Sequence, residues 1–359
     1  MDSRRFIRDD IQDLSSYVSV KPLEVLATEI GVPVDELVKL DANENPYGTT
    51  LVVREAAASV PLHIYPDPAQ GRLRSDIAAY LGVGPEQVVA GTGSDELLDL
   101  ILRLTLPTAT ATATPTFGMY SFLSGIAGIR HVEVPRNSTF DLDLVGLRNA
   151  VGSGAGVVFV ASPNNPTGNA ATLDEIEELC GLDALIVVDE AYAEFAGTSA
   201  IPLLERYENL IVMRTFSKWA GLAGLRVGYA VAHPDLVEPM LAIKQPYNVN
   251  VAADAAARAA LAHRDELLAT VRTIVVERDR LSHEVGTLGW LVPYPSDANF
   301  VLFDVEKADA SAIAASLRER GVLVRHYDRA DLSNKLRISA GRPQDTDRLV
   351  KAFKEVGPK

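Results

Sequence analysis

The stretch that decides the fold is Thr215-Phe216-Ser217-Lys218, which continues through Gly221-Leu222-Ala223-Gly224-Leu225-Arg226-Val227-Gly228 to Tyr229. It follows the apolar, strand-like run 210–213, and three glycines in eight residues make a helix improbable there. We therefore expect the lysine in a loop at a strand end, where α/β enzymes keep their active sites. Lysine can form a Schiff base with a carbonyl group when its amine is uncharged, and Ser217 and Arg226 can donate hydrogen bonds to an anion such as phosphate. The alternative is a surface lysine and arginine on a glycine-rich loop.

Composition limits the classes of protein to which this chain can belong. The 359 residues suffice for about two domains with a large core. A hydrophobic fraction of 47% and a charged fraction of 23% are ordinary for a globular protein. The formal net charge of −14 argues against nucleic acid or an anionic membrane as the main partner, because both require a basic face. A small anionic ligand stays compatible with this charge if a few arginines converge locally.

The single cysteine and the first residues predict the compartment. Cys180 cannot form an internal disulfide, which fits a reducing compartment. It follows the helical pattern 173–179, so a buried structural thiol is favoured over a nucleophile. Residues 1–5 are followed by mixed charges without an apolar segment, unlike a secretory signal. No apolar run approaches the ~20 residues that span a bilayer, and we expect a cytoplasmic protein.

Short β-branched runs alternate with helical patterns from about residue 72 to residue 232. The predicted strands are 87–90, 109–113, 131–134, 157–161, 185–188, 210–213 and 227–232. Such alternation predicts an α/β fold whose large domain has a mostly parallel seven-stranded sheet, flanked by helices on both faces.

The pattern changes after residue 235. An alanine-rich segment, 251–261, runs on with helical spacing to residue 275 and predicts one or two long helices. Predicted strands at 298–304, 322–325 and 336–339 around a helix at 310–318 then indicate a smaller α+β domain. The first 50 residues predict an irregular arm with one short helix at 23–30. We therefore expect an N-terminal arm (1–50), a large domain (51–262) and a small C-terminal domain (263–359).

Two glycine-containing motifs follow predicted strands. Gly91-Thr92-Gly93-Ser94-Asp95 opens a helix, whose unpaired backbone amides favour a phosphate; a plain helix cap is the alternative. Asn165 lies within the turn 162–168, where two prolines and a glycine give it a rigid position from which to donate a hydrogen bond.

Four aromatic or acidic side chains complete the set of candidates. Asp189 ends a wholly apolar strand and needs a cation or donors, because burying a carboxylate alone is costly; an Asp that caps the next helix is the alternative. Tyr192 can donate to an oxygen over the same site. Phe117, at another strand end, belongs to the core or stacks on a flat ring. Tyr65, in the turn-rich run 65–71, is an ordinary packed aromatic or reaches a neighbouring chain.

The predicted strand ends thus offer the parts of a single site. They are a phosphate cradle, an aromatic plate, an amide donor, a buried carboxylate, a phenol, a lysine and an arginine. Pyridoxal 5'-phosphate needs this set, because its aldehyde requires a lysine, its ring nitrogen a carboxylate, and its phenolate and phosphate hydrogen-bond donors. We expect this cofactor and no metal ion.

The chain resembles the fold-type-I pyridoxal-phosphate-dependent aminotransferases, and within them the histidinol-phosphate aminotransferases. The motifs that carry the likeness are SPNNPTG (162–168), VVDEAY (187–192), TFSK and AGLAGLRVGY on either side of Trp219 (215–229), and LRIS-G (336–341). The likeness runs from Tyr17 to about Phe353, and its motifs are specific as an ordered set.

For the cofactor, the resemblance implies a role for each candidate. Lys218 would carry the covalent imine and move the proton, and Asp189 would hold the pyridine nitrogen protonated. Tyr192 and Asn165 would bond the ring oxygen, and Phe117, where the family often has tyrosine, would stack on the ring. The phosphate would be surrounded by Gly93, Ser94, Asp95, Ser217 and Arg226. Tyr65 would reach that phosphate from the partner subunit, which implies a homodimer.

For the substrates, the resemblance implies a ping-pong reaction in histidine biosynthesis. Histidinol phosphate and 2-oxoglutarate would give imidazole acetol phosphate and glutamate. Arg337 would clamp the carboxylate of glutamate or 2-oxoglutarate, together with Asn165. Arg325 and Tyr17 would meet the histidinol phosphate end, with Asn299 near this wall by analogy. An exposed arginine without a role is the alternative for Arg325.

Two departures from the family pattern concern the substrate more than the reaction. The segment 17–22 lacks the glycine that family members commonly show before Lys21-Pro22, and Trp219 follows the lysine where smaller or aliphatic residues are common. An aromatic amino acid aminotransferase and a threonine-phosphate decarboxylase on the same scaffold are therefore alternatives. A non-catalytic ligand-sensing domain of a transcription regulator would need a basic DNA-binding module, for which the arm leaves no room.

Overall fold

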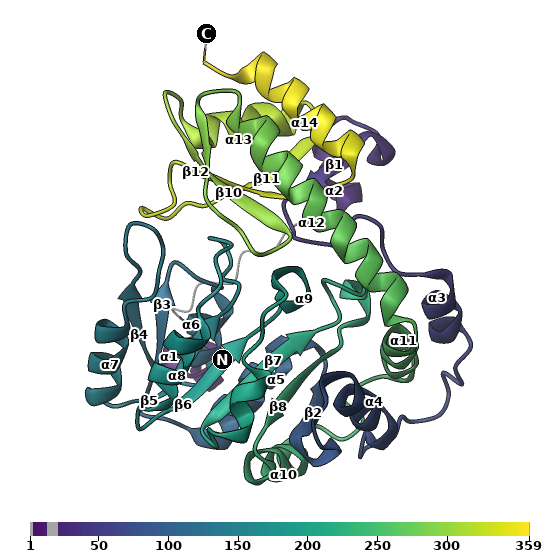
Figure 1. The fold of residues 1–359 in the computed structure, drawn as a ribbon, viewed down its shortest axis with the longest axis vertical. Helices are drawn as coiled ribbons and strands as arrows, with labels where there is room; N and C mark the ends of the chain where they lie inside the picture. The colour runs from purple at the N-terminus through teal and green to yellow at the C-terminus, as the bar shows by residue number, and fades with distance from the viewer. Residues whose placement is uncertain (1–2, 13–20, 359) are drawn as a thin grey trace.

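The larger of two sheets has seven strands in the order β2-β8-β7-β6-β5-β3-β4 (Figure 1). The structure, a computed structural model, describes residues 3–12 and 21–358. The strands are β2 (Val88–Gly91), β3 (Ala109–Thr114), β4 (Arg130–Pro135), β5 (Ala155–Ala161), β6 (Leu185–Asp189), β7 (Leu210–Thr215) and β8 (Gly228–Ala232). β8 runs antiparallel to both of its neighbours, and the other pairs are parallel. The predicted mostly parallel seven-stranded sheet is confirmed.

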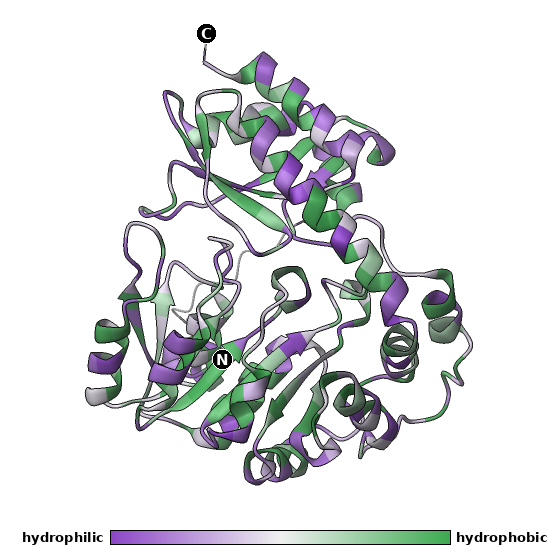
Figure 2. Cartoon of the chain, in the orientation of Figure 1, coloured by the Kyte–Doolittle hydropathy of each residue, from purple (hydrophilic) through white to green (hydrophobic). Residues whose placement is uncertain are grey.

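Helices cover both faces of this sheet because successive strand residues point to opposite sides. On β6, Val187 packs into one core, whereas Ile186 and Val188 pack into another. The helices of the first core are α5 (Gly93–Thr105), α6 (Met119–Ile126) and α10 (Pro234–Ile243). Those of the second are α4 (Gly71–Leu81), α7 (Leu144–Gly152), α8 (Leu173–Cys180) and α11 (Val251–Ala262). The strands between them are coloured largely hydrophobic in Figure 2, as a sheet buried on both faces requires.

A second sheet, drawn above the first in Figure 1, has five strands in the order β1-β11-β12-β10-β9. The strands are β1 (Val38–Leu40), β9 (Leu291–Pro293), β10 (Phe300–Val305), β11 (Val322–His326) and β12 (Lys335–Ser339). Its core is shared with α13 (Ala310–Glu319), α14 (Pro343–Val356) and the end of α12 (Arg264–Gly286). Since the beginning of α12 packs into the large domain, this helix joins the two parts. The predicted smaller α+β domain is confirmed.

The N-terminal region is more ordered than the sequence predicts. The helix expected at 23–30 is α2 (Leu23–Ile30), but β1 was not predicted. β1 pairs in parallel with β11, so residues assigned to the arm belong to the small sheet. Three residues are too few to show the alternation that identifies a strand. The boundaries 1–50, 51–262 and 263–359 stay a prediction.

The remaining helices are short. They are α1 (Asp9–Gln12), α3 (Leu51–Ala58) and α9 (Ala193–Ala196), with 3₁₀ turns at Ser3–Phe6, Val34–Glu36, Pro85–Gln87, Ile201–Glu205 and Ala223–Leu225. Cys180 is buried and free, as predicted, and burial raises its pKa to about 11. In the described ranges, no helix has the length and apolar composition needed to cross a membrane.

Candidate active site

A cavity of about 670 Å³ lies where the strand ends of the large sheet meet the small sheet. Most of the predicted site residues line it: Ser94, Asp95, Phe117, Asn165, Asp189, Tyr192, Ser217, Lys218, Arg226, Arg325 and Arg337. They come from seven segments that are far apart in the sequence. The topology therefore brings together side chains that the sequence suggested only one strand end at a time.

Lys218 follows β7 and lies in the loop predicted for it. Its Nζ is 3.5 Å from the carbonyl oxygen of Ala42 and 5.8 Å from the centre of the Tyr192 ring. Burial, with the nearby positive charges of Arg337 and Arg226, lowers its pKa to about 8. A substantial fraction of this amine is therefore uncharged in neutral to mildly alkaline solution, which a nucleophilic lysine requires.

Asp189 is 5% exposed at the end of β6. The Tyr120 hydroxyl donates to its Oδ2 at 2.8 Å, and the Ala191 backbone N–H donates to its Oδ1 at 3.2 Å. No ion pair joins it to a cation within the described residues. Burial raises its pKa to about 6 even though the Tyr120 hydrogen bond acts in the opposite direction. The carboxylate is thus held in place by neutral donors and, among the described residues, lacks a positive partner.

Sequence analysis did not identify Tyr120. Its ring stacks on Phe159 at 5.2 Å between centroids and meets Phe117 edge-on at 5.7 Å. Phe117 lines the cavity, so one aromatic cluster supports both the aromatic plate and the Asp189 carboxylate. The sequence does place Tyr120 three residues after Phe117, near the start of a helix. Residues three apart on a helix are neighbours, so this spacing could have identified Tyr120.

Two hydrogen-bond donors, Asn165 and Tyr192, line the cavity. Arg337 Nη1 donates to Asn165 Oδ1 at 2.5 Å, which leaves the NH₂ group of Asn165 to donate into the cavity. The Tyr192 oxygen accepts a hydrogen bond from Asn43 Nδ2 at 3.0 Å. Asn43, which is 1% exposed, is a second residue that the sequence analysis missed.

The start of α5 lies at the same cavity, with Ser94 and Asp95 among the lining residues. Thr92 makes no side-chain cap there, so the first amides of α5 are available to a ligand. Gly93 has φ +77°, and a Cβ at this position would lie 2.6 Å from Arg226 Nη2. Arg226 therefore lies against the helix start, where it pairs with Asp95 at 3.1 Å. Ser217, 5% exposed, lies on the same wall.

Arg325 and Arg337 form the opposite wall. They are directly paired on β11 and β12, so their side chains leave the same face of the small sheet. Arg325 lies over the Tyr327 ring, with Cζ 5.4 Å from its centre. Arg337 Nε is buried and has no hydrogen-bond partner in the described part of the chain. This wall can hold an anion on the far side of the cavity from Arg226.

Two predicted residues lie elsewhere in the described structure. Tyr65 is 78% exposed, does not line the cavity, and stacks on Tyr247 at 4.6 Å between centroids. Asn299 is fully buried behind the cavity wall and donates to the Asn43 carbonyl at 3.1 Å. Tyr17 lies outside the described residues.

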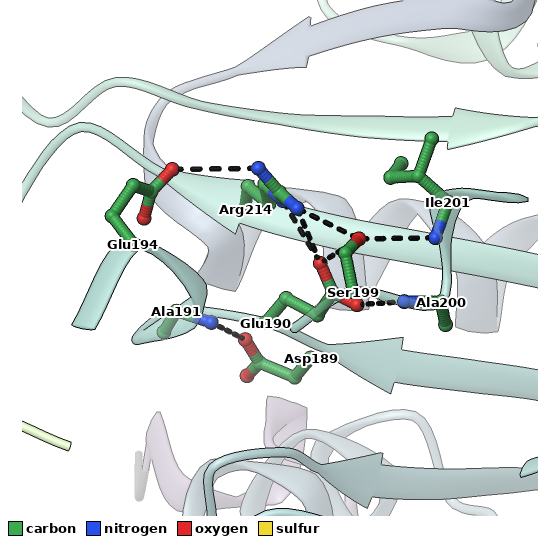
Figure 3. A network of polar contacts seen from close by, with 8 residues as sticks. All are labelled: Asp189, Glu190, Ala191, Glu194, Ser199, Ala200, Ile201 and Arg214. Carbon is green, nitrogen blue, oxygen red and sulfur yellow. Dashed lines mark hydrogen bonds and ion pairs between the residues drawn. The ribbon is translucent and has the colours of Figure 1, made fainter. Parts of the chain in front are cut away.

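A second polar cluster lies behind the cavity (Figure 3). Arg214 donates to Glu190 Oε2 at 2.9 Å through Nε and to Ser199 at 2.7 Å, and its Nη1 is 3.5 Å from Glu194 Oε1. Glu190 also accepts from Ser199 at 2.8 Å and from the Ala200 backbone N–H at 2.5 Å. Burial raises the pKa of Glu194 to about 7. None of these three charged side chains lines the cavity.

The cavity thus combines a lysine of lowered pKa after β7, a carboxylate after β6 that pairs with no cation of the described residues, and the start of α5. On this sheet, that arrangement defines an enzyme of the fold-type-I class. A family model, aminotransferase class I and II, matches residues 35–353. The chain belongs to this family and is an aminotransferase.

Proteins named histidinol-phosphate aminotransferase are similar to the chain over almost its full length. One from Roseiflexus castenholzii is 47% identical, with 98% of each chain covered. One from Dehalococcoides mccartyi is 43% identical, with 99% of this chain and 98% of the other covered. The crystal structure of the enzyme from Sinorhizobium meliloti in complex with pyridoxal-5'-phosphate has a TM-score of 0.89 and 31% identity, with 99% and 98% covered.

Proposed function

We propose that this aminotransferase binds pyridoxal 5'-phosphate and transfers the amino group between histidinol phosphate and 2-oxoglutarate, giving imidazole acetol phosphate and glutamate. The observation that carries this proposal is the wall of Arg325 and Arg337 facing Lys218. Histidinol phosphate carries a phosphate on the CH₂–O group next to the reacting carbon, and 2-oxoglutarate carries a carboxylate on the reacting carbon. One arginine wall can therefore hold both substrates in turn, as a ping-pong reaction in histidine biosynthesis requires.

The polar groups of the cavity fit the cofactor. The α5 amides, Ser217 and Arg226 would hold its phosphate, and Phe117 would lie against its ring. When bound, pyridoxal phosphate supplies an aldehyde that condenses with amines and a ring that accepts electrons from the substrate carbon. Asp189 would offer the ring nitrogen a carboxylate that pairs with no cation of the described residues and whose pKa burial raises to about 6.

Lys218, Asp189 and Tyr192 would act as the catalytic residues. Lys218 Nζ would condense with the aldehyde and later hold the proton that moves from the substrate carbon. Its pKa of about 8 suits it to both tasks near neutral pH. Asp189 would stay ionised, because a positive charge on the ring nitrogen favours its charged form. The Tyr192 hydroxyl and the Asn165 amide would donate to the ring oxygen.

Arg337, which lines the cavity, would bind a substrate carboxylate, and Arg325 would bind the phosphate of histidinol phosphate. Asn165 and Tyr17 would complete this side of the site. Replacing Arg325 with Met should weaken the binding of histidinol phosphate more than that of glutamate. The Arg337→Met change should weaken both.

We further propose a cytoplasmic homodimer in which Tyr65 reaches the neighbouring phosphate site. Tyr65 lies beside exposed apolar residues, including Leu62 at 80% and Ile64 at 56%, which a second subunit would cover. Mixing inactive Tyr65→Ala and Lys218→Ala proteins tests this arrangement. If Tyr65 acts across the interface, each mixed dimer contains one intact site, so activity returns. A Tyr65 that acts within its own subunit would give no such recovery.

A half-reaction assay tests the activity. The protein loaded with pyridoxal phosphate is mixed separately with histidinol phosphate, phenylalanine or threonine phosphate, and the visible cofactor absorption, keto product and carbon dioxide are followed. We expect absorption loss and keto product most efficiently with histidinol phosphate. A preference for phenylalanine would make the protein an aromatic aminotransferase, and carbon dioxide released from threonine phosphate would make it a decarboxylase.

A further inference from the structure

The Tyr192 hydroxyl has a buried neighbour that determines where its hydrogen can point. Asn43 Nδ2 donates to the Tyr192 oxygen at 3.0 Å, and Asn43 is 1% exposed. A phenol that accepts an N–H on its oxygen keeps its own hydrogen for another acceptor. Since both residues line the cavity, that acceptor can be a ligand atom.

Ser339 fixes which end of the Asn43 amide faces Tyr192. The Asn43 backbone N–H donates to Ser339 Oγ at 2.9 Å, and Ser339 Oγ donates to Asn43 Oδ1 at 2.9 Å. A serine hydroxyl has one hydrogen, and here Asn43 Oδ1 accepts it. The amide oxygen therefore faces Ser339, and the NH₂ group faces Tyr192.

The backbone of Asn43 is held as well. Asn299 Nδ2 donates to the Asn43 carbonyl at 3.1 Å. Asn43 has φ +54°, in the left-handed region that asparagine tolerates better than most residues. Asn299 and Ser339 belong to the small-domain side, whereas Tyr192 follows β6 of the large sheet. Asn43 thus joins a large-domain phenol to the small sheet.

We propose that Asn43 is a positioning residue, which directs the Tyr192 hydroxyl hydrogen towards the ring oxygen of pyridoxal phosphate, and that Ser339 holds Asn43 in this orientation. The inference rests on the proposed function, because it concerns the cofactor of that same site. Asn43 acts through Tyr192 and needs no contact with the cofactor or the substrate.

The arrangement parallels that of Asn165. Arg337 orients the Asn165 amide, and Ser339 orients Asn43. Arg337 and Ser339 are two residues apart on β12, so their side chains lie on the same face of the strand. One strand of the small sheet thereby directs both donors to the ring oxygen.

The test is the pH dependence of the visible absorption of bound pyridoxal phosphate in the Asn43→Gly protein. Glycine accepts the positive φ and keeps the two backbone hydrogen bonds, so that only the amide is lost. Hydrogen bonds donated to the ring oxygen lower the pH at which this absorption changes. Loss of one neutral hydrogen bond should therefore raise the midpoint by about half a unit to one unit. Ser339→Ala, which keeps the Asn43 amide but not its anchor, should raise it by less.

A double-mutant cycle separates positioning from a general structural effect. In a Tyr192→Phe background, Asn43→Gly should leave the midpoint unchanged, because the hydroxyl on which it acts is gone. The inference is overturned by an unmoved midpoint in Asn43→Gly, or by an equal shift in both backgrounds. Absence of a visible cofactor band in the parent protein would overturn the proposed function and this inference together. A normal band and normal transamination with an unmoved midpoint would overturn this inference alone.

Discussion

Asp189 and Glu190 are consecutive carboxylates at the end of β6. Their side chains point to opposite faces of the sheet and therefore have different surroundings. Asp189 lies in the cavity, where a phenol hydroxyl and one backbone N–H bind it. Glu190 lies on the other side, where Arg214, Ser199 and the Ala200 backbone N–H bind it (Figure 3). Both are buried, at 5% and 2% exposure. Among the described residues, the protein supplies a positively charged partner, Arg214, to Glu190 but supplies none to Asp189.

That difference separates a binding carboxylate from a structural one. A buried carboxylate paired with a guanidinium has its electrostatic needs met within the chain. Asp189 has only neutral donors among the described residues, and the raised pKa shows the cost of its burial. The protein keeps this unfavourable charge where a cationic ligand atom can compensate for it.

Asp189→Asn should produce the largest change in activity. We expect transamination to fall by about 10³-fold, because an amide cannot hold the ring nitrogen protonated. The cofactor-free protein should unfold at the same or a higher temperature at pH 8, since a buried charge without a cation has been removed. Glu190→Gln is the matched control and should lower the unfolding temperature. If Asp189→Asn alone destabilised the free protein, its carboxylate would be structural.

Arg214→Met should have the largest effect on stability. It leaves Glu190 and Glu194 buried without their shared cation, which should lower the free energy of unfolding by about 3–5 kcal/mol. Denaturant titration measures this change. Arg206→Met serves as the control, because the Arg206–Glu177 pair is exposed and should contribute only about 0–1 kcal/mol. Equal losses in both variants would contradict the view that the buried cluster is a structural support.

Glu194 should make the stability of this cluster depend on pH. Its folded pKa of about 7 lies above the ordinary value of 4.5. The native state therefore retains a proton that the unfolded state releases, and stability from this group is lost as pH rises from 4.5 to 7. Glu194→Gln should remove this loss, gaining about 3 kcal/mol at pH 8 and little at pH 4.5. Unfolding curves at the two pH values provide the measurement, and parallel pH profiles for the two proteins would contradict the assignment.

Lys218 should give the smallest of these effects, a shift in the pH at which its amine reacts. Labelling by an amine-specific reagent in the cofactor-free protein should be half-maximal near pH 8, the pKa set by burial and Arg337. Arg337→Met should raise that midpoint, because it removes a positive charge that disfavours the ammonium form. Mass spectrometry of the labelled peptide follows the reaction. A midpoint near 10.5 in the parent protein would show that the cavity does not alter this lysine.

The strands and the strand-end residues could be predicted because their signals are local. Runs such as 185–188 are apolar throughout, and polar residues after such runs meet at one edge of a parallel sheet. The contacts that orient those residues could not be predicted in the same way. Asn43 lies 149 positions from Tyr192 and 296 from Ser339, and no periodicity links such distant residues. β1 was missed for a different reason. Its sequence signal is local, but the strand is only three residues long.

The position of β1 has a mechanical consequence. Within residues 21–358, the small sheet is connected to the large domain twice, by residues 41–50 after β1 and by α12. A body attached at two separated points turns most easily about the line between them and resists turning in other directions. Any opening of the cavity should therefore be a rotation of the small sheet about the line that joins these two connections. Asn43 lies within one of the two connections. Nicking the chain between residues 46 and 50 would remove one of these two connections, and the small sheet would gain new directions of rotation.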